Sequence, residues 1–392
     1  MKTVVKRRPF GNTGLFVSEV GFGAMNLRML NTWEEGVALV NHVLDQGINL
    51  IDTARAYKGV NGSGVEVQSE DMVGAAIEGR TDIDEPIVIV TKGHGYTPEV
   101  FDQDLQDSLR TLRIKKTDKG LFIGQTEVKL VVFFHGIKED RWNTIKASNV
   151  IEHAKKRQQE GLFHYLGFSS HYGDGKEIKE ALDTGAFQVM ELPYNVYNRS
   201  IGEDGKTDFL KYAHDKGVAI VNMKAFNGSS MVATSKLIKD FCSITYSDML
   251  RFSLSNPNIS TVDVGARYPH EYDADVQASL LPMLTQEERQ AMKKEADKIS
   301  GLFDGICREC MHCLEKFECP QGINFPAILG NHSRYQIAKE LGEDTTPYVE
   351  NYAKMQGPKA DSCVGCAGCT EWCEYHLDIP AMMIRAHADL AK

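Results

Sequence analysis

The chain has 392 residues, of which 42% are hydrophobic and 25% are charged, and its formal net charge is −10 at pH 7. This composition is typical of a globular protein with room for two or three domains. The negative charge argues against nucleic acid as a main partner, because phosphate binding needs a concentrated basic surface, and the lack of an apolar run of about 18 residues argues against a membrane span.

Short apolar runs alternate with amphipathic segments from residue 18 to about residue 266, which is the pattern of repeated βα units. A preceding segment, residues 4–10 and 15–17 around Gly-Asn-Thr-Gly, predicts a β-hairpin. Helices are expected at residues 34–45, 98–112, 149–160 and 207–216. Eight strands, the number that closes a (β/α)8 TIM barrel, are expected at residues 20–23, 49–52, 87–91, 130–134, 165–169, 189–192, 219–223 and 261–264. We expect the hairpin to cap the bottom of this barrel.

Two stretches are longer than short connections require. Residues 58–70 follow the second strand, on the face where barrel active sites form, and residues 115–128 precede the fourth strand, on the opposite face. A doubly wound dinucleotide-binding fold is the competing topology, but Gly-Phe-Gly-Ala-Met-Asn at 21–26 lacks the third glycine of its fingerprint. A charged helix at 285–299 ends the barrel, so we expect domains at residues 1–300 and 301–392.

Four polar residues lie at or after the C-terminal ends of adjacent predicted strands. Asp52 and Tyr57 follow the second strand, Lys92 ends the third and His135 ends the fourth. Taken singly, each has an ordinary structural explanation, such as a helix cap or a core histidine. Their placement on three adjacent strands, at the catalytic face of a barrel, favours a common chemical role.

The four residue types suit proton donation to a carbonyl oxygen that receives hydride at its carbon. A free phenol titrates near pH 10, so Tyr57 needs a nearby ammonium, Lys92, to lower its pKa. Asp52 would keep that ammonium charged in a partly dry site. His135 would donate a hydrogen bond that orients or polarises the carbonyl.

Several motifs resemble the aldo-keto reductase family. They are Phe-Gly-Asn-Thr-Gly-Leu-Phe-Val-Ser-Glu-Val-Gly-Phe-Gly-Ala-Met at 10–25, Asn-Leu-Ile-Asp-Thr-Ala-x-x-Tyr at 49–57, Tyr-Leu-Gly-Phe-Ser-Ser-His at 165–171 and Phe-Gln-Val-Met-Glu-Leu-Pro-Tyr-Asn at 187–195. The resemblance covers roughly residues 5–280 and implies a (β/α)8 barrel with the tetrad Asp52, Tyr57, Lys92 and His135. The chain is also similar to the subset of this family that carries a C-terminal ferredoxin-like domain.

The resemblance implies a nicotinamide cofactor bound without a Rossmann domain. It places Ser169, Ser170 and Gln188 near the nicotinamide carboxamide, and Lys224 and Arg267 near the phosphates after strands seven and eight. Family members that use NADPH tend to have a second basic residue a few positions after strand eight, where this chain has Glu271. NADPH and NADH therefore both remain candidates.

Eight of the nine cysteines lie after residue 306, in two groups of four. In each group three cysteines follow at two-residue gaps, which suits three corners of an iron–sulfur cubane, while the fourth can ligate a second cluster. An internal repeat supports this pairing, because each fourth cysteine is followed seven residues later by proline, Pro326 and Pro380. The expected ligands of the two 4Fe-4S clusters are Cys307, Cys310, Cys313 and Cys373, and Cys363, Cys366, Cys369 and Cys319.

Disulfides and structural zinc are the competing explanations of these cysteines. The N-terminus, Met-Lys-Thr-Val-Val-Lys-Arg-Arg-Pro, lacks the apolar core of a secretory signal, so we expect a cytoplasmic protein in a reducing compartment. Zinc sites have no obvious use for a third cysteine at the same spacing. The five residues before Cys319 and the glutamate after Cys373 depart from the bacterial ferredoxin pattern, which leaves a single cluster open.

Three functions follow from these motifs. The first is an NAD(P)-dependent reductase of a small carbonyl compound, with structural or regulatory clusters. The second is an electron-transfer reductase, in which the clusters feed a substrate or a barrel-bound flavin and exchange electrons with a partner. No flavin fingerprint is present in the sequence. The third is a redox sensor or partner protein without enzymatic activity. Neither the substrate nor the oligomeric state can be read from the motifs.

Overall fold

The computed structural model describes residues 5–60, 64–171, 175–226, 241–300, 305–307, 312–373 and 376–392. The chain divides into two compact units, Met1–Phe226 with Tyr246–Thr285, and Asn227–Thr245 with Gln286–Lys392. The division falls at the start of helix α11 (Gln286–Ser300), whereas we expected the domain boundary at the end of that helix. Within the described ranges, no helix has the length and apolar character needed to cross a membrane.

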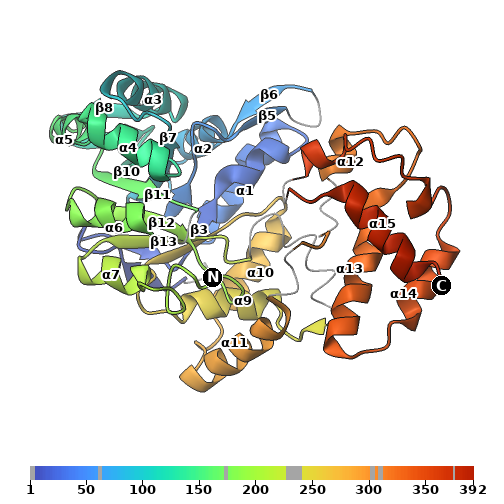
Figure 1. Ribbon diagram of the computed structural model, residues 1–392. Helices are drawn as coiled ribbons and strands as arrows, with labels where there is room; N and C mark the ends of the chain where they lie inside the picture. Colours follow the sequence, from blue (N-terminus) through green and yellow to red (C-terminus); the bar gives the residue numbers. More distant parts are fainter. Residues whose placement is uncertain are drawn as a thin grey trace. The chain divides into compact units, whose positions relative to one another are not determined.

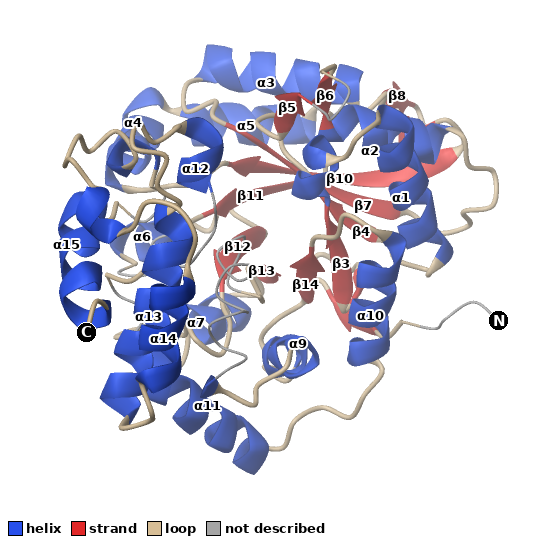
Figure 2. Cartoon of the chain, turned by 90° about the vertical axis from the view of Figure 1, so that its right-hand side faces the viewer, coloured by secondary structure: helices blue, strands red, loops and turns tan. Residues whose placement is uncertain are grey.

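The first unit is built on a closed barrel of eight parallel strands, which confirms the predicted fold (Figure 2). Each strand pairs with its two neighbours, and β11 closes the ring onto β10. Strands β7, β12 and β13 are buried along their whole length, as expected for parallel strands covered on both faces. The strands are β3 (Val20–Gly23), β4 (Leu50–Asp52), β7 (Ile87–Gly93), β10 (Thr126–Phe134), β11 (Tyr165–Ser169), β12 (Val189–Pro193), β13 (Ala219–Met223) and β14 (Thr261–Val264).

The predicted N-terminal hairpin closes the bottom of this barrel. Its strands β1 (Arg7–Pro9) and β2 (Phe16–Ser18) are antiparallel, and Phe10 and Val17 join the apolar core inside the barrel. In the turn, Gly11 has a φ of 55°, and a Cβ there would lie 2.5 Å from the carbonyl oxygen of Gly217. Glycine therefore permits both the turn and its close approach to the start of β13.

Both long insertions form antiparallel hairpins. Strands β5 (Lys58–Val60) and β6 (Glu66–Gln68) pair after β4, on the catalytic face. Strands β8 (Lys115–Thr117) and β9 (Gly120–Ile123) extend the sheet beside β10, which is why β10 begins four residues before the predicted strand. The helices in the described part of this unit are η1 (Ala24–Met29), α1 (Trp33–Asp45), α2 (Ser69–Glu78), α3 (Pro98–Thr111), α4 (Glu139–Ser148), α5 (Val150–Gln159), α6 (Lys176–Asp183), α7 (Phe209–Asp215), α9 (Tyr246–Leu254) and α10 (Pro269–Ser279).

The second unit is mostly helical (Figure 1). Each copy of the internal repeat contains the start of a helix. Asn324 caps α13 (Phe325–Leu341) and Asp378 caps α15 (Ile379–Leu390), and both helices have a proline in the first turn. Both helices pack into one apolar core, to which Cys313, Cys369 and Cys373 also belong. The other described elements are α11, α12 (His312–Lys316), α14 (Thr346–Lys354), η3 (Ala360–Ser362) and η4 (Thr370–Trp372).

Candidate active site

The four tetrad candidates meet at the C-terminal end of the barrel strands. Lys92, on β7, is buried, and its Nζ donates to Asp52 Oδ1, to the carbonyl oxygen of Thr53 at 3.2 Å and to Tyr57 Oη at 3.4 Å. His135 follows β10, and its ring stands edge-on to the Tyr57 ring with centroids 6.1 Å apart. Asp52, Lys92 and Tyr57 thus form one hydrogen-bonded chain beside the imidazole.

The electrostatics of Tyr57 differ in sign from the sequence-based expectation. Lys92 does lower the pKa of the phenol, as expected, but burial raises this pKa by more. The carboxylates of Asp52, Glu191 and Asp263 raise it further, so the net shift is upward. Tyr57 is therefore a protonated acid across the physiological pH range, and its proton is released only to a strongly basic acceptor.

His135 is a neutral imidazole at physiological pH. Burial, together with the positive charge of Lys92, lowers its pKa to about 2. Its Nδ1 has no hydrogen-bond partner among the described residues. The ring of His94 stacks on it with centroids 4.7 Å apart. A neutral ring keeps one N–H donor and one acceptor nitrogen, so it can donate to a carbonyl oxygen without carrying charge into the site.

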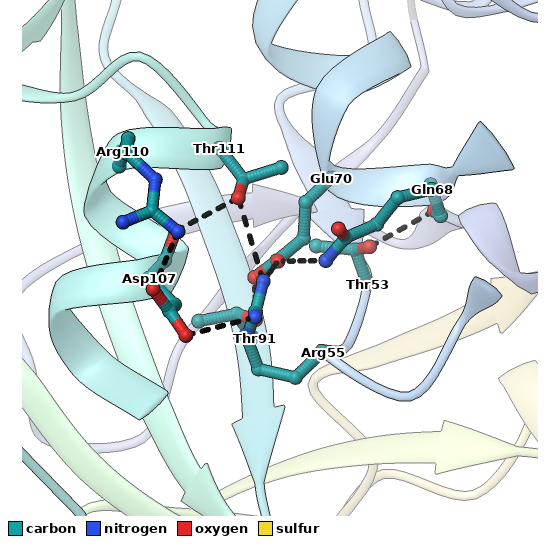
Figure 3. A network of polar contacts seen from close by, with 9 residues as sticks. Thr53, Arg55, Gln68, Glu70, Thr91, Asp107, Arg110 and Thr111 are labelled. Carbon is teal, nitrogen blue, oxygen red and sulfur yellow. Dashed lines mark hydrogen bonds and ion pairs between the residues drawn. The ribbon is translucent and has the colours of Figure 1, made fainter. Parts of the chain in front are cut away.

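A buried polar network fixes the loop that carries Tyr57 (Figure 3). Glu70, at the start of α2, is fully buried and accepts hydrogen bonds from Arg55 Nη1 at 3.0 Å and Thr91 Oγ1 at 2.7 Å. The backbone N–H of Arg55 donates to the carbonyl oxygen of Lys92 at 2.9 Å. Because Thr91 and Lys92 are adjacent on β7, the network connects the loop that carries Tyr57 to strand β7.

Replacing Arg55 with methionine is expected to lower the free energy of unfolding by about 3–5 kcal/mol, because the Glu70 carboxylate is left buried without its charged partner. Arg110 provides a matched control, since it also pairs with Asp107 but is 75% exposed. Arg110→Met should cost less than about 0.5 kcal/mol. Denaturant unfolding of both variants measures the difference, and equal costs would show that the network does not stabilise the loop.

Ser169 ends β11 at the same face of the barrel, Ser170 follows directly after it, and both are buried. Ser169 Oγ accepts a hydrogen bond from the backbone N–H of Gly136 at 2.9 Å, and Ser170 Oγ donates to the carbonyl oxygen of Ile137 at 3.0 Å. These bonds hold the loop that follows His135.

Gln188 does not join this group, and the expectation for it requires a correction. It precedes β12 at the N-terminal end of the strand, so it lies at the bottom of the barrel. There its Oε1 accepts from the backbone N–H of Leu166 at 3.0 Å and its Nε2 donates to the carbonyl oxygen of Ala186 at 2.8 Å. The residue of β12 that reaches the catalytic face is Glu191, whose Oε2 is 3.3 Å from Lys92 Nζ.

Lys224 and Arg267 follow the neighbouring strands β13 and β14. Lys224 has a left-handed backbone conformation, with a φ of 59°. Burial lowers the pKa of its ammonium, and the Glu191 carboxylate partly offsets this shift. The backbone N–H of Arg267 donates to Glu271 Oε2 at 2.7 Å. The same Glu271 oxygen accepts from the backbone N–H of Tyr268, so this carboxylate caps helix α10.

Sequence reasoning missed Glu191, Asp263, His94 and His171, all of which act on the electrostatics of the tetrad. Burial lowers the pKa of His171 to about 4, and Lys224 contributes to this shift. The sequence did contain a signal for Glu191 and Asp263. Each is the charged residue of a short, mostly apolar strand, Val-Met-Glu-Leu-Pro and Thr-Val-Asp-Val. A buried strand rarely contains an acid that lacks a partner.

Four cysteines of the second unit line one cavity, together with apolar side chains such as Phe317, Ile323 and Met383. Burial raises the pKa of the Cys369 thiol to about 11, and the three neighbouring thiols add to the shift. No disulfide joins the described cysteines, and Cys310 lies outside the described residues. The four that share the cavity are Cys319, Cys363, Cys366 and Cys369.

The model of the "Aldo/keto reductase family" matches residues 19–245 of the chain. The L-galactose dehydrogenase of Arabidopsis thaliana is 24% identical over 75% of this chain and 92% of its own length. The uncharacterized oxidoreductase YqkF of Bacillus subtilis is 22% identical over 74% and 96%. The solved structure of aldo-keto reductase AKR11C1 from Bacillus halodurans, in its holo form, covers 74% of this chain and 96% of its own at 24% identity, with a TM-score of 0.59. With its eight-stranded parallel barrel, the chain belongs to the aldo/keto reductase family of NAD(P)-dependent oxidoreductases.

Proposed function

We propose that the protein reduces a small-molecule carbonyl to an alcohol with NADPH or NADH, and that Asp52, Tyr57, Lys92 and His135 form its catalytic tetrad. One observation carries most of this proposal. A single buried ammonium, Lys92, donates hydrogen bonds to both Asp52 and Tyr57, beside a histidine that burial keeps neutral.

When bound, the nicotinamide supplies a hydride to the carbonyl carbon. Tyr57 donates its phenolic proton to the carbonyl oxygen, which accepts it readily because the arriving hydride makes that oxygen a strong base. The tyrosinate that remains is stabilised by the Lys92 ammonium until a proton returns from solvent. Asp52 keeps the ammonium charged and in place. His135, as a neutral donor, orients the carbonyl oxygen toward Tyr57.

The residues around the tetrad fit a nicotinamide cofactor. Ser169 Oγ accepts a backbone N–H, and a hydroxyl that accepts one hydrogen bond can still donate its own hydrogen to a carboxamide. Ser170 follows it, directly after β11. Lys224 and Arg267, after adjacent strands, provide positive charge for the phosphates. NADPH and NADH both satisfy this arrangement.

The proposed function is tested by mixing the protein with NADPH or NADH and a panel of aldehydes, ketones and sugars, and following the absorbance of the reduced nicotinamide. L-Galactose and its lactone belong in the panel because one relative is named L-galactose dehydrogenase. We expect turnover that depends on both cofactor and carbonyl. Nicotinamide binding without turnover of any compound would favour the non-enzymatic sensor.

We also propose that residues 301–392 hold two 4Fe-4S clusters and that these are structural or regulatory. The shared cavity supports the proposal, since one cysteine of the first group lies with three of the second, as an exchanged fourth ligand requires. A small cysteine-rich unit folds more readily around metal, and thiolate ligands suit the reducing cytoplasm. The ligand sets are Cys307, Cys310, Cys313 and Cys373, and Cys319, Cys363, Cys366 and Cys369.

Electron transfer is the second candidate function of the clusters. It is favoured by the exposure of Cys366, because a cluster ligand at the surface brings the redox centre within reach of an electron-transfer partner. Nicotinamide carries electrons as a pair and a cluster carries them singly, so this function needs a flavin or a substrate as the bridge. If the purified protein releases no flavin and its clusters stay oxidised when NAD(P)H and substrate are added, this function is excluded.

A further inference from the structure

Three carboxyl groups from three barrel strands surround one ammonium at the mouth of the barrel. Asp52, Glu191 and Asp263 each have a carboxylate oxygen within 4.8 Å of the other two, and Lys92 is the cation beside them. Asp52, Glu191 and Lys92 are 1–2% exposed. If all three acids were ionised, the group would carry a net charge of −2 in a buried setting, which is strongly unfavourable.

The lysine cannot satisfy all three acids by hydrogen bonding. An ammonium has three N–H donors, and those of Lys92 point to Asp52 Oδ1, the carbonyl oxygen of Thr53 and Tyr57 Oη. Glu191 Oε2 lies 3.3 Å from the same nitrogen but has no hydrogen-bond partner among the described residues. Asp263 Oδ1 and Asp52 Oδ2 also lack one in the described part of the chain, although Asp52 accepts from Lys92 with its other oxygen. A buried carboxylate oxygen without a donor is best relieved by taking up a proton.

We infer that Glu191 carries a proton in the working enzyme and is a positioning residue: by staying neutral, it leaves Lys92 paired with Asp52 and preserves the acidity of Tyr57. This inference rests on the proposed carbonyl reduction and deepens it. It predicts that the ionisation state of Glu191 sets the alkaline limit of that reaction.

The charges that face Glu191 determine whether carbonyl reduction speeds up or slows down as pH rises. Burial raises the pKa of Glu191 to about 8, the Asp52 carboxylate adds to the shift, and Lys92 and Lys224 oppose it. Burial also raises the pKa of Asp263, where the other acids add to it. Above pH 8 the Glu191 carboxylate forms, and negative charge at this position raises the pKa of Tyr57. Tyr57 then becomes a weaker acid, so reduction slows as pH rises through about 8.

The test compares the pH dependence of kcat/KM for carbonyl reduction in three variants. In the wild-type protein we expect kcat/KM to fall by up to about tenfold per pH unit above pH 8. Glu191→Gln should lack this descending limb, and Glu191→Asp should keep one because it restores a carboxyl group. Glu19→Gln is the matched control, since Glu19 is equally buried but pairs with Arg8 away from the tetrad. A Glu191→Gln profile that keeps the wild-type limb would overturn the inference.

Infrared spectroscopy gives a second readout that needs neither turnover nor a folded Glu191→Gln variant. Because burial also raises the pKa of Asp275 to about 8, the spectra are recorded on the Asp275→Asn protein. There Glu191 should still show a protonated-carboxyl band that disappears between about pH 6 and about pH 10. The lack of such a titrating band would overturn the inference. A titrating band in a protein that reduces no carbonyl would instead count against the proposed function and leave the protonation of Glu191 supported, so the two failures are distinguishable.

Discussion

Tyr57→Phe is expected to lower kcat for carbonyl reduction by about 10²- to 10⁴-fold, the usual contribution of a positioned general acid. The phenylalanine ring fills the same space, but no proton is available within reach of the carbonyl oxygen. The Lys92 ammonium keeps its bonds to Asp52 and Thr53, so the fold should persist. Steady-state kinetics with saturating cofactor measure the loss, and cofactor fluorescence should show unchanged nicotinamide binding.

Tyr165→Phe is the matched control for this experiment. Its hydroxyl donates to the carbonyl oxygen of Thr13 at 3.0 Å, in the hairpin at the bottom of the barrel. The control should lose about 1 kcal/mol of stability and no activity. If Tyr57→Phe kept kcat within about tenfold of the wild-type value, another group would have to donate the proton, and the tetrad assignment would be wrong.

Cys369→Ser is expected to halve the iron content of anaerobically prepared protein, from about eight irons and eight sulfides to about four of each. The Cys369 side chain lines the cavity and belongs to the apolar core of the second unit. Losing the cluster should therefore also make this unit sensitive to proteases, because metal binding and folding are coupled in small metal-bound domains. Iron and sulfide analysis and limited proteolysis measure the two effects.

Cys319→Ser tests the exchange of ligands between the two groups. Cys319 lies far from Cys369 in the chain but in the same cavity. Its substitution should therefore affect the same cluster as Cys369→Ser, which electron paramagnetic resonance after reduction measures. Cys242→Ser, outside both groups, should change neither iron nor sulfide. If Cys319→Ser instead altered the cluster that Cys313→Ser removes, each group of four would serve its own cluster.

The barrel could be predicted from sequence because each strand is a short apolar run bounded by polar or glycine residues. The structure begins β4 at Leu50 rather than 49 and ends β7 at Gly93 rather than 91, small shifts that leave the fold intact. The hairpins within 58–70 and 115–128 were not predicted. Their strands are three or four residues long and exposed or mixed in burial, so they lack an alternating apolar pattern to reveal them.

The site shows where sequence reasoning fails. Gln188, just before β12, and Glu191, within it, are three residues apart, which is enough to move a side chain from the bottom of the barrel toward its catalytic mouth. The family motifs predicted that Gln188 lies at the cofactor site. The register of β12 against β11 and β13 instead brings Glu191 to Lys92. Only a three-dimensional arrangement reveals which strand position lies at which depth.

The sequence by itself determined the barrel, the four tetrad candidates and the spacing of the cysteines, because apolar periodicity, strand ends and ligand gaps are local properties of the chain. The tertiary structure decided how charge is shared. It brings the half-buried Tyr57 and the buried Lys92 together with three carboxyl groups from β4, β12 and β14, which reverses the expected shift of the phenol's pKa. The physical reason is that desolvation and Coulomb interactions depend on distances between strands far apart in sequence.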